Sequence, residues 1–188
     1  MTAADMNQPS DEELVELARR REPGGLNALY ERYYDRMFRF AYTRLGNRQD
    51  AEDVTQDVFL KMVDKIGSFK WQGVPFAAWL FKIGHNSVTD FHRKSNARGP
   101  QTHLEDLPLI ASDNPEETVV NKLVLEAVNE NIQRLSPAQQ QVLALRFGAD
   151  LSVLDTARIL NKAEGTVKAT QFQAFQALRK LMANEGQR

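Results

Sequence analysis

Acidic and amide side chains recur in the stretch DAEDVTQDVF at intervals of three and four residues. If this stretch is helical, Asp50, Asp53 and Asp57 lie on one face with Gln56 beside them, while Ala51, Val54, Val58 and Phe59 point inward. Paired carboxylates can act as a general acid and base. Here no histidine or metal-ligand spacing accompanies them, which argues against a catalytic pair. A solvated helix face is the other interpretation, since most charged runs are solvated.

A second stretch places aromatic side chains next to basic ones. Phe69, Lys70 and Trp71 fall in a loop between Gly67 and Pro75. The helix expected after it carries a polar series: Lys82, His85, Asn86, Thr89, Asp90 and Arg93. Aromatic faces stack nucleobases and cations hold phosphates, so this combination predicts a surface for single-stranded nucleic acid. The alternative is that the aromatic residues are core, which we expect for Trp79 but not for Trp71 in its loop.

Near the end of the chain, Ala157, Asn161 and Val167 have the spacing of a helix-turn-helix. A small residue lets two helices cross closely, Asn tolerates the left-handed turn, and Val packs the second helix onto the first. Any helical hairpin with a tight turn is the alternative. The second helix, from Glu164, offers side chains that can pair with bases or phosphates: Thr166, Lys168, Gln171, Gln173 and Arg179.

The apolar residues of that second helix predict its inward stripe as Val167, Phe175, Leu178 and Leu181, with Phe172 as a further candidate member. Phe172 lies off this line, and both burial and exposure remain open for it. An exposed Phe172 would be available to a thymine methyl group or to a protein regulator.

The elements that would position these side chains are all helical. The patterns predict helices over 11–21, 26–45, 49–66, 76–94 and 116–135, with Pro23-Gly24-Gly25 ending the first one and a capping box at Ser136 and Gln139 starting another. A polar, Pro-containing stretch interrupts them. We therefore expect an all-α protein with a first domain over 10–95, a flexible linker over 96–115 and a second domain over 116–185.

Composition limits the function further. The chain has 188 residues, 42% of them apolar, a formal net charge of −1 and no cysteine. The absence of cysteine excludes disulfides and thiolate metal sites. His85 and His92 are seven residues apart without a third ligand, so no metal or cofactor is predicted. No stretch has the length of a membrane span or the pattern of a signal peptide, which favours a cytoplasmic protein. The near-neutral charge argues against coating DNA.

Taken in order, these stretches resemble the sigma-70 family of bacterial transcription initiation factors, in its extracytoplasmic-function branch. The resemblance is carried by DAEDVTQDVFLKM, SFKWQGVPF, FAAWLFKIGHNSVTDFHRK, LSPAQQQVLALRFGADLSVLDTARIL and EGTVKATQ, and covers nearly the whole chain. It implies two domains, called sigma domain two and sigma domain four, without catalytic activity. Such a protein recruits core RNA polymerase to promoters and helps to melt them.

The resemblance also implies roles for the residues above. Asp50, Asp53, Gln56 and Asp57 would contact the coiled coil of the polymerase β′ subunit, and the second domain would contact the β flap. The aromatic loop and the helix after it would read the −10 promoter element, and the helix from Glu164 would read the −35 element. An anti-sigma factor is an implied partner, and acids of the linker (Glu105, Asp106 and Asp113) would enter the polymerase cleft. Phe172-Gln173 departs from the His-Arg that many relatives carry.

Two other classes of function remain for comparison. A helix-turn-helix repressor or activator would bind duplex DNA tightly without polymerase, usually as a dimer, but would leave DAEDVTQDVF and the aromatic loop without a role. A helical enzyme has less support, because the sequence contains no glycine-rich phosphate loop, nucleophile elbow or zinc motif.

Overall fold

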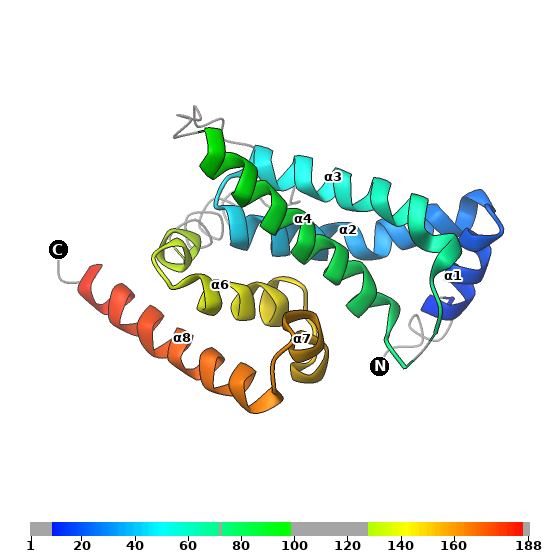
Figure 1. Ribbon diagram of the computed structural model, residues 1–188. Coiled ribbons are helices and arrows are strands. Elements are labelled where there is room, and N and C mark those ends of the chain that lie inside the picture. Colours follow the sequence, from blue (N-terminus) through cyan, green and yellow to red (C-terminus); the bar gives the residue numbers. More distant parts are fainter. Residues whose placement is uncertain (1–8, 72, 99–127, 186–188) are drawn as a thin grey trace, which may run out of the picture.

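The computed structural model describes residues 9–71, 73–98 and 128–185, and within these ranges the regular structure is entirely helical (Figure 1). The N-terminal region contains α1 (Asp11–Arg19), α2 (Pro23–Leu45), α3 (Arg48–Lys65), the 3₁₀ turn η2 (Ile66–Ser68) and α4 (Phe76–Arg98). The C-terminal region contains a helical stretch over 128–133, α6 (Pro137–Leu143), the π-helical turn η3 (Ala144–Gly148), α7 (Val153–Leu160) and α8 (Glu164–Glu185). The expected all-α class is confirmed.

The inward face of α2 forms the centre of the N-terminal region. Its buried residues are Leu29, Tyr33, Met37, Phe40 and Ala41, which repeat at the helical spacing that the sequence shows. Helix α3 contributes Ala51, Val54, Val58 and Phe59 to the same core, as predicted. Burial of such an apolar stripe, rather than helix propensity, provides most of the stability of a helix in a folded protein.

The prediction for Pro23-Gly24-Gly25 is wrong, because these residues begin a helix instead of ending one. Helix α1 ends at Arg19, and Arg21, with φ of 59°, makes the turn. Pro23 then takes the first position of α2, where its missing N–H costs nothing. Gly25 is needed for a close crossing, since a Cβ there would lie 2.5 Å from the backbone nitrogen of Ala18.

Most of the predicted linker and of the helix expected over 116–135 lies outside the described residues. Helix α4 extends to Arg98 and so covers the first three residues of that linker. The domain boundaries therefore remain predictions.

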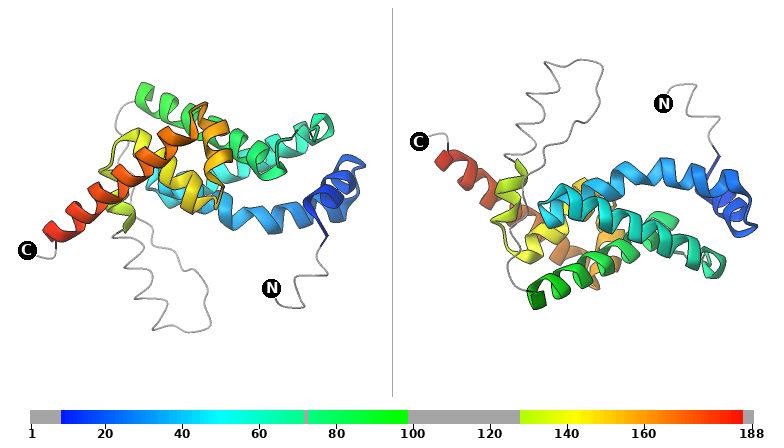
Figure 2. Two further views of the ribbon diagram at one scale, coloured as in Figure 1. Left: turned by 90° about the horizontal axis from the view of Figure 1, so that it is seen from below. Right: turned by 90° about the horizontal axis from the view of Figure 1, so that it is seen from above.

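The two regions pack against each other. Figure 1 and the two views of Figure 2 show α2, α3 and α4 running lengthwise beside one another, with α6, α7 and α8 gathered along one side of them. One hydrophobic cluster joins the regions and includes, from the C-terminal region, Ala144, Leu145, Ala149, Leu151 and Ile159. Two further clusters lie within the C-terminal region, one around Leu135, Leu143 and Ala174 and one around Val142, Ala157 and Val167.

Candidate functional site

The acidic face of α3, formed by Asp50, Asp53, Gln56 and Asp57, is only partly free. Asp53 and Gln56 are exposed, whereas Asp50 and Asp57 are half-buried. The Asp57 carboxylate accepts a hydrogen bond from Lys61 Nζ at 2.6 Å within α3 and one from Ser87 Oγ at 3.1 Å, and the bond from Ser87 ties α3 to α4. Asp53 and Gln56 are therefore the members of this face that a partner can reach directly.

Two apolar side chains continue the exposed face of α3, and the sequence analysis missed them. Leu60 is 68% exposed and Val63 is 48% exposed. Leu60 is four residues after Gln56, so the two lie on the same side of the helix. The sequence could have indicated this exposure, because Leu60 falls outside the inward stripe of Val54, Val58 and Phe59. An exposed acidic and apolar strip on one helix is typical of a protein-binding surface.

The aromatic loop divides its side chains between core and surface. Phe69, expected on the surface, is buried, and its ring lies 4.9 Å from the Trp71 ring and 5.1 Å from the Trp79 ring. Trp71 remains 36% exposed and Lys70 is exposed. Phe69 thus supports the exposed indole from beneath. Beside it lies a shallow hollow of about 290 Å³, lined by Ser68, Phe69, Lys70, Val74 and Trp79.

The polar series on α4 forms an exposed face next to this loop. Lys82, Asn86, Thr89, Asp90 and Arg93 are exposed, and Arg93 pairs with Asp90 at 3.2 Å. His85 is half-buried, and burial, assisted by the nearby charges of Lys82 and Arg44, lowers the pKa of its imidazole to about 4. His85 is consequently neutral near pH 7 and offers hydrogen bonds rather than a positive charge.

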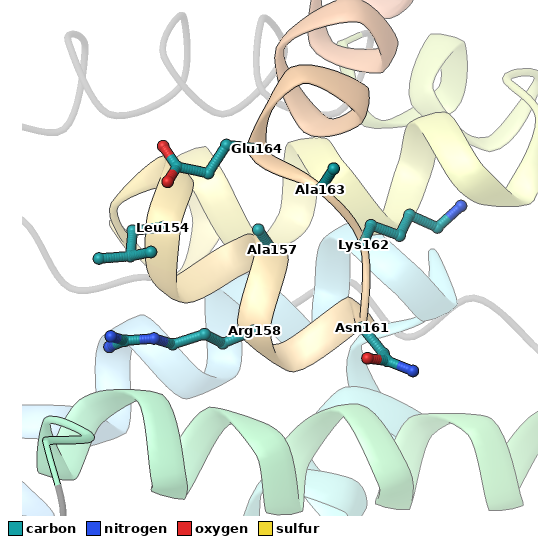
Figure 3. A pocket seen from close by; sticks show the side chains of 7 residues that line it. All are labelled: Leu154, Ala157, Arg158, Asn161, Lys162, Ala163 and Glu164. Atoms are coloured by element: carbon teal, nitrogen blue, oxygen red, sulfur yellow. The ribbon is translucent and has the colours of Figure 1, made fainter.

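The predicted helix-turn-helix is confirmed in its geometry. Asn161 ends α7 in the left-handed conformation, with φ of 53° and ψ of 51°. Ala157 and Val167 are buried and share one cluster with Val142 of α6. Figure 3 shows the hollow of about 550 Å³ along α7 and the turn, which is lined by Leu154, Ala157, Arg158, Asn161, Lys162, Ala163 and Glu164.

The start of α8 exposes Thr166, Lys168 and Gln173, as the sequence predicts, and Arg179 is exposed further along. Gln171 differs from the expectation of exposure, because it is half-buried and its Oε1 accepts a hydrogen bond from Arg146 Nε at 3.1 Å. That bond holds Gln171 against η3 and leaves fewer donors and acceptors for a base.

The inward stripe predicted for α8 is wrong at Phe175. Phe175 is 46% exposed and its ring meets that of Phe147 at 5.3 Å, while Ala174 is the buried residue. The reason is that α8 packs on α6 through Ala174, Leu178 and Leu181, which turns Phe175 to the side. Phe172, for which both outcomes were open, is 65% exposed.

No group of three or more His, Cys, Asp or Glu side chains that could hold a metal is found among the described residues. In the same part of the chain, no helix is long and apolar enough to cross a membrane.

Comparisons with known proteins show the family to which the chain belongs. Residues 29–98 match the model of sigma-70 region 2, and residues 132–180 match the model of sigma-70 region 4. The chain belongs to the sigma-70 family of RNA polymerase sigma factors, in its extracytoplasmic-function (ECF) branch.

Individual relatives place it within that branch. The chain is 37% identical over 184 residues to the ECF RNA polymerase sigma factor BldN of Streptomyces coelicolor, covering 97% of this chain and 70% of that protein. It is 31% identical over 160 residues to the ECF sigma factor SigW of Bacillus subtilis, covering 79% of this chain and 83% of that protein. In fold it is similar to CnrH in complex with the cytosolic domain of CnrY, with a TM-score of 0.71, 22% identity, and coverage of 93% of this chain and 97% of that one.

Proposed function

We propose that this protein binds core RNA polymerase, recognises the −35 and −10 elements of promoters and promotes DNA melting, without a catalytic step of its own. The carrying observation is that a complete helix-turn-helix and an aromatic, basic loop occur in one chain that belongs to the ECF sigma factors. The protein would act in the cytoplasm, where the polymerase is. Most of its affinity for promoters would come from the holoenzyme, because a chain of net charge −1 neutralises few phosphates.

For the −10 element, we infer that one base leaves the stack and sits in the hollow beside Trp71. Extruding a base costs a few kcal/mol, so a lined pocket is needed to offset it. The hollow supplies aromatic walls from Phe69 and Trp79 and a cation from Lys70. Asn86, Thr89 and Arg93 on α4 continue this surface for the neighbouring nucleotides, with Lys82, His85 and Asp90 beside them.

For the −35 element, the first turns of α8 would enter the major groove. Lys168 can contact guanine or phosphate, Gln173 can pair with adenine, and Phe172 can contact a thymine methyl group. Thr166, Gln171 and Arg179 complete the proposed set. Few cations are exposed on this helix, so contacts to bases would carry more of its binding than contacts to phosphates.

Two protein partners belong to the proposal. The exposed part of the acidic face would dock on the coiled coil of the β′ subunit, and the C-terminal region would contact the β flap. An anti-sigma factor would compete for these surfaces. The fold-level neighbours include CnrH with CnrY and, at a TM-score of 0.69 and 24% identity, the Bartonella quintana sigma factor RpoE with the anti-sigma factor NepR.

Binding to core polymerase tests the first part of this proposal. The variant Asp53→Ala, Gln56→Ala removes exposed side chains and leaves Asp57, which links α3 to α4, in place. We expect its affinity for purified core polymerase to fall at least about tenfold, as for central contacts of an interface. The control Glu31→Ala, Asp35→Ala removes two exposed carboxylates from α2. Equal affinities of both variants and the wild type would contradict the assignment.

Promoter strand capture tests the second part. Trp71→Ala should weaken binding of holoenzyme to a single-stranded −10 oligonucleotide by about 1–3 kcal/mol, the value of one stacked base. Lys168→Ala should weaken binding to duplex −35 DNA and leave the oligonucleotide unaffected. Duplex binding by the free protein that exceeds binding by the holoenzyme would instead favour a helix-turn-helix repressor.

A further inference from the structure

Gln171 lies at the edge of the proposed −35 surface, where α8 passes η3. Lys168, three residues before it, and Phe172, directly after it, are exposed, whereas Gln171 is half-buried. Residues three apart lie on the same face of a helix, so Lys168 and Gln171 share one side of α8. Gln171 therefore borders the face that would enter the major groove.

Arg146 of η3 holds the carboxamide of Gln171 in one orientation. Arg146 Nε donates to Gln171 Oε1 at 3.1 Å. A guanidinium has only donors, whereas a carboxamide has an oxygen that accepts and a nitrogen that donates. The atom that faces Arg146 must therefore be the oxygen, and the nitrogen is left to donate to another partner.

Further contacts hold Arg146 itself in place. Its Nη1 donates to the carbonyl of buried Leu151, and its guanidinium lies 5.8 Å from the centre of the Phe147 ring. The Phe147 ring in turn meets the Phe175 ring at 5.3 Å. The direction of the Arg146 Nε–H bond is thus set by the protein before any DNA binds. The bond to Gln171 also involves a charged donor, and such hydrogen bonds are stronger than neutral ones.

This orientation restricts the base that Gln171 can read. A glutamine pairs with adenine through both atoms of its carboxamide, because the oxygen accepts from adenine N6 and the nitrogen donates to adenine N7. With its oxygen turned to Arg146, Gln171 offers a base only the N–H donors of its nitrogen. Guanine presents two neighbouring acceptors in the major groove, O6 and N7, whereas adenine places a donor beside its acceptor. A carboxamide that only donates therefore favours guanine over adenine.

We propose that Gln171 is a specificity-determining residue that reads guanine in the −35 element, and that Arg146 is the positioning residue that sets this choice by holding Gln171 Oε1. This rests on the proposed function, because it requires that α8 enters the major groove. Gln173 is exposed and keeps the pairing with adenine proposed above. Two glutamines of one helix would thus read different bases.

Selection from a pool of duplexes measures the base preference directly. Promoter duplexes with a randomised −35 segment are bound to holoenzyme made with each variant, and the bound fraction is sequenced. With wild type we expect one position at which guanine exceeds adenine at least about fivefold, the lower end of the discrimination that a good side-chain pair gives. Gln171→Leu should lose this preference and keep those at other positions. The control Gln176→Leu, which alters an exposed glutamine further along α8, should keep them all.

Two more variants separate base reading from a purely structural bond between η3 and α8. Arg146→Met keeps apolar bulk but releases the carboxamide, so adenine should rise to at least the level of guanine at the same position. Gln171→Glu keeps the contact with Arg146 as an ion pair and presents an acceptor to the base, so cytosine, with its N4 donor, should be preferred there. A purely structural bond would instead lower binding to every sequence and leave the base ratios unchanged.

The outcomes distinguish a failure of the inference from a failure of the function on which it rests. Base ratios that are the same in wild type, Gln171→Leu and Gln171→Glu would overturn the inference. So would unchanged ratios in an Arg146→Met protein that circular dichroism shows to be folded, and if that protein does not fold, the two Gln171 variants decide. A wild-type holoenzyme that selects no −35 sequence would contradict the proposed function instead.

Discussion

The two regions of this protein bury their apolar residues in different ways. The N-terminal region encloses whole aromatic side chains, including Phe40, Phe76 and Phe81, between its own helices. The C-terminal region has two small clusters of its own, and many of its buried residues, such as Leu145 and Ile159, join the cluster of the N-terminal region. Its longest helix, α8, packs against α6 and α7, and it also touches η3 through Gln171 and Phe175.

We infer from this difference that the N-terminal region is the more self-sufficient of the two and that the C-terminal region depends on its packing against it. A region that buries little surface by itself opens at low free-energy cost. A helix with one free face can present that face to a DNA groove.

Truncation of Phe40 to Ala should cause the largest loss of stability among these changes. Its side chain is fully buried and meets the Phe81 ring edge-on at 5.7 Å. We expect Phe40→Ala to lower the free energy of unfolding by about 3–5 kcal/mol in chemical denaturation. The control Phe172→Ala, on exposed α8, should stay within about 0.5 kcal/mol. Similar losses of stability at both positions would contradict the proposed difference between the two regions.

Low pH should destabilise the N-terminal region because it protonates the histidines of α4. Burial, with the charges of Lys82 and Arg44, lowers the pKa of His85 to about 4, and burial also lowers the pKa of His92. The unfolded chain takes up these protons near pH 6.5, so the stability that neutral His85 provides is complete above that pH and is lost as pH falls towards 4. After allowance for partial solvation, we expect a loss of about 2 kcal/mol from His85. Chemical denaturation of wild type and of His85→Asn between pH 7 and 4.5 measures this loss. The same dependence of the free energy of unfolding on pH in both proteins would contradict the prediction.

Asn161 tests how far the C-terminal region depends on its turn. Because Asn161 has a left-handed backbone, Asn161→Ala should cost about 1–2 kcal/mol, while Asn161→Gly should be nearly neutral. Thermal denaturation measures both variants, and Lys162→Ala serves as the control next to the turn. A neutral Asn161→Ala would show that the turn is not held in this conformation.

Each region has a capping box, and removing it should cause the smallest loss of stability among these changes. Ser10 with Glu13 begins α1, and Ser136 with Gln139 begins α6. Each Ser→Ala change should cost about 1 kcal/mol. Hydrogen exchange should show the loss spreading into α7 and α8 for Ser136→Ala but staying near α1 for Ser10→Ala. The reverse pattern would argue that the C-terminal region is the more independent one.

Local features of the structure could be predicted from the sequence. Ala157, Asn161 and Val167 depend on one turn and two adjacent helices, and the capping box at Ser136 depends on residues three apart. The stripe of α2 follows from its 3.6-residue period. Asp53 and Gln56 were also correctly placed on an exposed face of α3.

Features that depend on how separate elements pack against one another could not be predicted. The Arg36 bond to the Ala149 carbonyl joins residues 113 positions apart. Nothing near Phe175 in sequence shows that η3 would bring Phe147 to its side, and nothing near Pro23 shows that Gly25 must pass close to Ala18. The burial of Phe69 likewise depends on Phe76 and Trp79 packing beneath the loop.

Transcription in vitro tests the central claim most directly, using purified core polymerase, a library of genomic fragments, and wild type beside Asp53→Ala, Gln56→Ala. We expect discrete start sites that share a two-part upstream sequence and that disappear with the double change. Duplex binding by the protein alone, with no association with core polymerase and no start sites, would contradict it.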